Sequence, residues 1–201
     1  STPLYSSAAS DVYKRQVLIG PGLGRCDDVS EVVESVLEYS KVPVIIDADG
    51  INAVAENMKA LSSCTCPVIF TPHTVEMSRL TGLEREYIED NRLVTAKEFA
   101  EENGVTLILK GHHTIVTGQD GEQYINITGN SGLATGGSGD VLTGIIAGLA
   151  AQGISVQEAA LAGVYMHGLA GDLASKGIIG MAAGEISQYL PQARRIIEQG
   201  E

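Results

Sequence analysis

Short apolar runs alternate with longer stretches of helical periodicity along most of this chain. The apolar runs are rich in valine and isoleucine and are closed by glycine or polar residues, which is typical of buried strands. We predict strands at residues 17–20, 42–46, 68–70 and 105–109. Most of the stretches between them carry apolar residues three and four positions apart, as amphipathic helices do. We predict helices at residues 28–39, 50–61 and about 87–102.

The pattern changes after the fourth strand. Residues 114–117 and 123–127 flank a G-Q-D-G turn and predict an antiparallel hairpin. Three helices follow, which we expect to begin at Asp140, Ser155 and Ala182. Strands that alternate with helices favour a mostly parallel central sheet with helices on both faces, which is an α/β fold.

Neither a repeat nor a linker divides the chain, and its 201 residues suit one domain with a substantial core. In parallel sheets of this kind, ligands bind beyond the carboxyl ends of the strands. Polar and glycine-rich segments follow all four strands, at residues 20–24, 47–52, 71–73 and 110–111. We therefore expect one binding site at that edge of the sheet.

The most informative segment covers residues 130–142 and reads N-S-G-L-A-T-G-G-S-G-D-V-L. Its small side chains let a ligand lie on the backbone, and the free amides at the start of the following helix attract an anion. Asp140 would repel that anion, so we interpret it as a group that handles a proton or a metal beside a phosphate. An acid that only complements the helix dipole is the alternative, but a plain helix start needs no such glycine-rich run. The segment predicts phosphoryl transfer.

Residues 20–24, G-P-G-L-G, followed by Asp47 at the next strand end, come close to a dinucleotide-binding fingerprint. Arg25 and Cys26 stand where a third glycine is required, which disfavours a dehydrogenase. A tight turn and direct ligand contact remain equally open for the glycine segment. Asp47 and Asp49 suit either a magnesium ion or the start of the helix that follows.

Thr71 and Pro72 fit the N-cap and the first position of a further helix. His73 follows them at the mouth of the expected site, which favours substrate contact over an ordinary surface position. Lys110, at the end of the fourth strand and beside a glycine, can reach a phosphate.

His112 and His113 are adjacent on what we expect to be an extended segment, where their side chains would diverge. A histidine–metal site is therefore not expected. The spacing of the chain's serines, histidines and acids supports no catalytic triad.

The chain carries a net charge of −12 and no sizeable basic cluster, which argues against a nucleic-acid partner. No apolar stretch reaches membrane-spanning length, and none resembles a signal peptide. Cys26, Cys64 and Cys66 form neither a disulfide framework nor a zinc pattern, so reduced cysteines in a cytoplasmic protein are expected.

Residues 6–16, S-S-A-A-S-D-V-Y-K-R-Q, resemble a translated sequencing-library adapter. We interpret residues 1–16 as a non-native tail, with a polar N-terminal tail as the alternative, and residues 17–201 as one domain that lacks its N-terminal part. A shortened sheet exposes an edge, which puts the folding and activity of this fragment in question.

From residue 17 onward the chain resembles the NAD(P)H-hydrate dehydratase family of the ribokinase-like superfamily. The ordered motifs that carry the resemblance are G-P-G-L-G, D-A-D-x-x-N, T-P-H-x-x-E-M, L-K-G and the glycine-rich segment, at residues 20–24, 47–52, 71–77, 109–111 and 130–144. The resemblance implies a three-layer sandwich that repairs hydrated NADH or NADPH, driven by ADP in most bacterial members and by ATP in eukaryotic ones. It also implies Mg²⁺, a homotetramer and an NAD(P)H-hydrate epimerase as functional partner.

The resemblance also assigns roles to residues. Asp140 would be the catalytic base and contact the substrate, the hydrate, together with Gly22, Gly24 and His73. The adenine nucleotide would bind a larger set: Lys110, Gly111, His112, His113, Thr114, Asn130, Gly136, Gly137, Ser138 and Gly139. Two other hypotheses remain, a vitamin-precursor kinase on the same scaffold and a nucleotide-binding protein without turnover. The T-P-H and G-P-G-L-G segments favour the dehydratase.

Overall fold

The computed structural model describes residues 15–24, 26–175 and 181–200. Most of the tail expected at residues 1–16 lies outside the described residues. The described strands form one six-stranded sheet in the order β1-β2-β3-β4-β5-β6. Their bounds are β1 (Val17–Ile19), β2 (Val44–Ile46), β3 (Val68–Phe70), β4 (Thr106–Leu109), β5 (Ile115–Thr117) and β6 (Gln123–Ile125). Strands β1 to β4 are parallel, and β5 and β6 continue the sheet as the predicted antiparallel hairpin.

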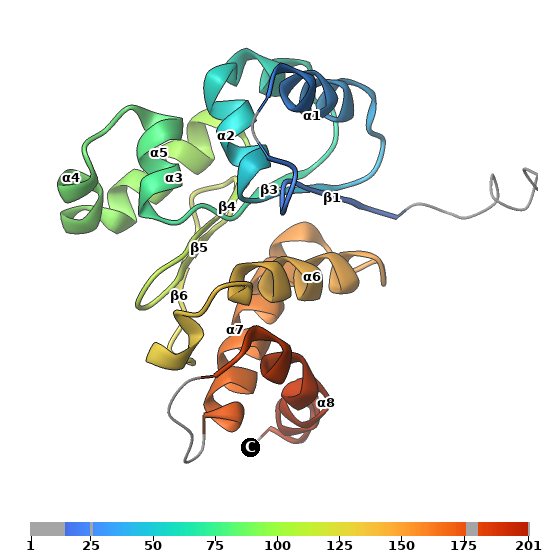
Figure 1. Cartoon of the computed structure of the whole chain (residues 1–201), viewed down its shortest axis with the longest axis vertical. Coiled ribbons are helices and arrows are strands. Elements are labelled where there is room, and N and C mark those ends of the chain that lie inside the picture. The colour runs from blue at the N-terminus through green and yellow to red at the C-terminus, as the bar shows by residue number, and fades with distance from the viewer. Residues whose placement is uncertain (1–14, 25, 176–180, 201) are drawn as a thin grey trace, which may run out of the picture.

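Helices cover both faces of the sheet (Figure 1). One face carries α1 (Asp27–Tyr39), α2 (Asp49–Glu56), α3 (Thr74–Thr81), α4 (Arg85–Asp90) and α5 (Arg92–Asn103), with the 3-10 helix η2 (Met58–Ser63). The other face carries α6 (Ser138–Ala150) and α7 (Val156–Ala174), preceded by the 3-10 helix η3 (Ser131–Leu133). Helix α8 (Ala183–Gln199) packs on α7 and α6. The predicted three-layer α/β fold is confirmed.

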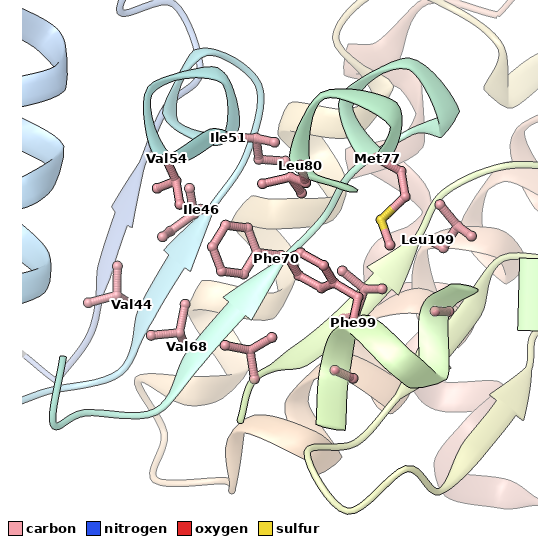
Figure 2. Packing of buried hydrophobic residues seen from close by; sticks show 14 of the residues in the cluster. Val44, Ile46, Ile51, Val54, Val68, Phe70, Met77, Leu80, Phe99 and Leu109 are labelled. Atoms are coloured by element: carbon pink, nitrogen blue, oxygen red, sulfur yellow. The ribbon is translucent and has the colours of Figure 1, made fainter. Parts of the chain in front are cut away.

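The core follows from the alternation of side chains along each strand. Ile46 and Phe70 point to the face of α2 and α3, while Ile45 and Ile69 point to the face of α6 and α7, and all four are fully buried. Figure 2 shows Phe70 beneath α2 and α3, next to Phe99. The centroids of the two rings lie 6.0 Å apart in an edge-to-face arrangement. Each such side chain contributes about 1.5–3 kcal/mol by leaving water. This packing on both faces holds the carboxyl ends of the parallel strands in line.

Two predicted helices are each divided in the structure. The helix expected at residues 50–61 is interrupted after Glu56 by Asn57, whose φ and ψ of −143° and 76° are not helical, and η2 follows. The helix expected at residues 87–102 divides at Asn91, whose side-chain amide donates to the carbonyl of Tyr87 at 2.9 Å. Asparagine side chains compete for backbone groups in this way, which hydrophobic periodicity does not record.

Cys26, Cys64 and Cys66 are free, and the Sγ atoms of the last two lie 3.3 Å apart. Burial raises the pKa of the Cys66 thiol to about 11. Within the described part of the chain, no group of three or more histidine, cysteine, aspartate or glutamate side chains is arranged for a metal ion. Over the same residues, each helix is too short or too polar to cross a membrane.

Candidate active site

The loops that follow β1 and β2 lie directly on one another. Gly20 has a φ of +127°, and a Cβ atom there would stand 1.7 Å from the carbonyl oxygen of Asp47, so only glycine fits. The amide of Gly24 donates to Oδ2 of Asp49 at 2.9 Å. The tight turn is thus present at Gly20, whereas Gly22 and Gly24 would meet nothing within 4 Å if they carried a Cβ.

A buried charge network lies at this edge of the sheet. The Nζ atom of Lys110 is 2.7 Å from Oδ1 of Asp47 and 3.8 Å from Oε2 of Glu76. The two acids are only 1% and 5% exposed, so each depends on the lysine for charge compensation. Gly139 lies against the same group, since a Cβ there would be 3.5 Å from Lys110 Nζ and 3.7 Å from Asp47 Oδ2. The ends of β2 and β4, the first turn of α3 and the start of α6 therefore meet around one lysine.

His73, not Thr71, is the N-cap of α3, so that part of the helix prediction was wrong. The Nδ1 atom of His73 accepts from the amides of Val75 and Glu76 at 3.1 and 3.2 Å, and Glu76 accepts from the amide of His73 at 2.8 Å. Thr71 is instead fully buried, where its hydroxyl faces the carbonyl of Ile46. The sequence pattern favoured threonine because threonine caps are commoner than histidine caps.

The capping bonds also define the protonation of His73. Because Nδ1 accepts from two amides, a neutral ring carries its proton on Nε2, which lies 3.4 Å from Oε1 of Glu76. Burial lowers the pKa of His73, against the raising effect of Glu76. In its neutral form the ring thus donates through Nε2, which faces Glu76.

A cavity of about 720 Å³ opens beside this network. Of the predicted site residues, it is lined by His73, Lys110, Gly111, His112, His113, Thr114, Asn130, Ser138 and Gly139. Gly22, Gly24, Gly136, Gly137 and Asp140 do not line it. The remaining wall comes from the segment after β6 and from α7, including Asn126, Thr128, Val164 and His167.

The glycine-rich segment ends in an uncapped helix. Helix α6 begins at Ser138, two residues before the predicted start, after Gly137 in the left-handed conformation with a φ of 86°. No side chain caps this terminus. The amide of Ser138 donates to the carbonyl of Thr135 at 3.2 Å, so the amides that follow it are the ones available to a ligand. Asp140 lies in the first turn, where it is exposed, and within the described part of the chain its carboxylate has no hydrogen bond or ion pair.

Two non-glycine residues at this edge have positive φ angles, Ala48 at 50° and His113 at 55°. Such conformations cost free energy and are concentrated at functional sites. The turn at His113 also brings its ring to 3.9 Å from that of His112. The expectation that these side chains diverge was wrong, because the segment is a turn and not extended chain.

The side chain of Asn130 links its own loop to the C-terminal end of α7. Its Nδ2 atom donates to Oδ1 of Asp172 at 2.8 Å and to Oγ of Ser175 at 3.0 Å, and its Oδ1 accepts from the amide of Gly132 at 2.9 Å. Its side-chain atoms are thus already engaged, although the residue lines the cavity.

Sequence reasoning missed His167 and Asp172 on α7. His167 is 8% exposed, and its Nε2 atom shares a hydrogen bond with Oγ of Ser138 at 3.2 Å. Two charged or polar residues interspersed with glycines, H-G-L-A-G-D at residues 167–172, are unusual inside a helix, and this was the available signal.

His167 is expected to make the free energy of unfolding fall at acidic pH. Burial lowers its pKa from 6.5 to about 4, so the unfolded chain takes up a proton first as the pH falls. The stabilisation is complete above about pH 6.5, and about 3 kcal/mol is lost between pH 6.5 and 4. His167→Gln should remove this pH-dependent loss. The free energy of unfolding of the variant, measured with urea, should therefore fall less than that of wild type between pH 6.5 and 4. Parallel pH profiles for the two proteins would contradict this.

Gly168 is expected to tolerate no side chain. A Cβ there would lie 2.2 Å from Oγ1 and 2.8 Å from the carbonyl carbon of Thr128. Gly168→Ala should therefore lower the free energy of unfolding by about 1–3 kcal/mol, despite its better helix propensity. Gly148→Ala, at an exposed position of α6 with nothing within 4 Å, should raise it by about 0.5–1 kcal/mol. Equal effects of the two substitutions in urea unfolding would rule out the close approach.

Comparisons with known proteins agree with this geometry. A family model described as NAD(P)H-hydrate dehydratase matches residues 6–192. The chain is 45% identical over 183 residues to the bifunctional NAD(P)H-hydrate repair enzyme of Moorella thermoacetica, covering 90% of this chain and 34% of that protein. It is 41% identical to the ADP-dependent (S)-NAD(P)H-hydrate dehydratase of Neisseria meningitidis serogroup B, covering 92% and 65%. The chain thus spans about a third of the bifunctional relative.

Solved structures give the same result. The ADP/ATP-dependent NAD(P)H-hydrate dehydratase of Bacillus subtilis, crystallised with ATP and Mg²⁺ and soaked with CoA, matches with a TM-score of 0.78 and 36% identity, over 90% of this chain and 66% of that one. A ribokinase-like superfamily protein of Enterococcus faecalis matches with a TM-score of 0.79 and 35% identity, over 90% and 63%. The ribokinase-like fold is confirmed, and the chain belongs to the NAD(P)H-hydrate dehydratase family.

Proposed function

We propose that this chain dehydrates the S form of NAD(P)H hydrate and restores NAD(P)H, with ADP as phosphate donor and with release of AMP and phosphate. The observation that carries the proposal is Asp140, an exposed carboxylate without a partner among the described residues. It follows Gly139, which lies against the Lys110–Asp47 pair. A free base beside uncapped helix amides is the arrangement that phosphoryl transfer to a hydroxyl requires. The activities named for the similar proteins support the choice of substrate.

The chemistry follows from the poor leaving ability of hydroxide. In the hydrate, a hydroxyl stands on the carbon beside the ring nitrogen. Asp140 takes the proton of that hydroxyl. The hydroxyl oxygen of the hydrate attacks the terminal phosphorus of ADP, and AMP is released. The ring nitrogen then expels phosphate with its lone pair, and loss of a proton from the neighbouring carbon restores the dihydropyridine.

The nucleotide would occupy the cavity of about 720 Å³. Its lining includes two segments, residues 110–114 and residues 130, 138 and 139. The amides of residues 136–139 would stabilise the charge that develops on the transferred phosphoryl group. Because the whole chain is strongly acidic, these local donors must outweigh an unfavourable overall field.

Magnesium in kinase-type sites is held by substrate phosphates with one or two protein carboxylates. Asp47 and Glu76 are two carboxylates at this edge that both face Lys110. They fit such partial coordination, and bound Mg²⁺ would neutralise phosphate charge. Gly22, Gly24 and His73 would contact the hydrate.

Three further properties belong to the same proposal: a cytoplasmic location, assembly into a homotetramer, and cooperation with an NAD(P)H-hydrate epimerase. The last is supported by the relative from Moorella thermoacetica, whose name records a bifunctional repair enzyme.

The test is recovery of reduced-nicotinamide absorbance when the chain is incubated with NADPH hydrate, Mg²⁺ and either ADP or ATP. Recovery with one nucleotide supports the proposal and identifies the donor. A stable phosphorylated product without recovery would replace it with a kinase activity. Nucleotide binding with no product at all would leave a binding protein without turnover.

A further inference from the structure

One side of α7, together with its C-cap, contacts the segment that leads into α6 at both ends and in the middle. Five residues of this side, His167, Gly168, Gly171, Asp172 and Ser175, follow one another at helical spacing and all face residues 128–138. We call these five residues the α7 clamp. None of them was part of the site that the sequence predicted.

The clamp holds the first end of the segment through Asp172. Its Oδ2 accepts from the amide of Gly129 at 2.8 Å, and its Oδ1 accepts from Nδ2 of Asn130 at 2.8 Å. Nδ2 of Asn130 also donates to Oγ of Ser175 at 3.0 Å. Bonds to an ionised acceptor are stronger than neutral ones, so this end of the segment is firmly fixed.

The clamp holds the other end through His167, whose Nε2 lies 3.2 Å from Oγ of Ser138, the first residue of α6. Between the two ends, Gly168 and Gly171 allow close approach. A Cβ on Gly168 would overlap the backbone of Thr128, and one on Gly171 would come within 2.6 Å of Leu133. Both ends and the middle of the segment are thus set by one helix.

We propose that His167 and Asp172 are positioning residues, which hold residues 129–138 in the conformation that receives the adenine nucleotide. The inference rests on the proposed function for the identity of that ligand. Its physical reason is preorganisation: a loop that is already ordered loses less conformational entropy when the nucleotide binds. Neither residue needs to touch the reacting atoms.

The test compares ADP binding by calorimetry in His167→Leu, His167→Gln and Asp172→Asn. Leucine cannot bond to Ser138, whereas glutamine can, and asparagine can serve only one of the two donors that face Asp172. We expect the Kd and the KM for ADP to rise about tenfold in the leucine and asparagine variants, and to stay within about threefold of wild type in the glutamine variant. Tyr165→Phe, which removes a hydroxyl from the same helix, is the control.

Hydrogen exchange gives a second readout that needs no ligand. The amides of residues 129–140 should exchange faster in His167→Leu and Asp172→Asn, while those of α1 and β3 stay protected. Unchanged exchange, or an ADP Kd within twofold of wild type in both variants, would overturn the inference. Tight ADP binding by the wild-type chain with no recovery of NADPH would overturn the proposed reaction alone.

Discussion

Replacement of Asp140 by asparagine is expected to lower kcat by about 10²–10⁴-fold, the contribution of a positioned general base. Asparagine has the same shape but cannot take the proton of the substrate hydroxyl. Because Asp140 is exposed and has no partner among the described residues, the substitution should disturb the fold little. Loss of its interaction with the helix dipole would cost at most about 1 kcal/mol.

ADP affinity separates the role of Asp140 from a general defect. The substitution removes a negative charge beside the phosphate site, so the Kd for ADP should be equal to or lower than that of wild type. Glu86→Gln, which changes an exposed acid in the first turn of α4, is the matched control and should leave kcat unchanged. If Asp140→Asn retained its kcat and lost only stability, Asp140 would be a helix-dipole acid and not the base.

Replacement of Lys110 by methionine is expected to lower the free energy of unfolding by about 3–5 kcal/mol, because it leaves buried Asp47 without its cation. Glu76, on the other side of the lysine, loses its counter-charge in the same step. Urea unfolding of the variant beside wild type measures this loss.

Two variants make this prediction specific. Lys97→Met removes the cation of an exposed pair with Glu101, at 3.9 Å, and should change stability by no more than about 0.5 kcal/mol. The double variant Asp47→Asn with Lys110→Met should recover part of the loss, since the uncompensated charge at Asp47 is then absent. A Lys110→Met protein as stable as wild type would show that Asp47 and Glu76 are solvated or compensated by other groups.

The sequence by itself determined the layers of the fold and the edge of the site. Strand β3 was predicted with its observed bounds. The ends of both hairpin strands and the start of α7 were predicted to within two residues. Such features depend on hydrophobic periodicity, capping serines and glycine runs, which are local properties. The parallel order of the strands then places their carboxyl ends together, so residues from four strand ends were expected at one edge.

Only the tertiary structure decided which side chains become partners. Lys110 and Asp47 are 63 positions apart, and Ser138 and His167 are 29 apart, so no local pattern connects them. The same holds for Asp49, whose carboxylate accepts from the amide of Gly24 across 25 positions. Buried polar groups take whichever partner the packed helices bring within reach, because leaving them unpaired costs more than any local preference supplies.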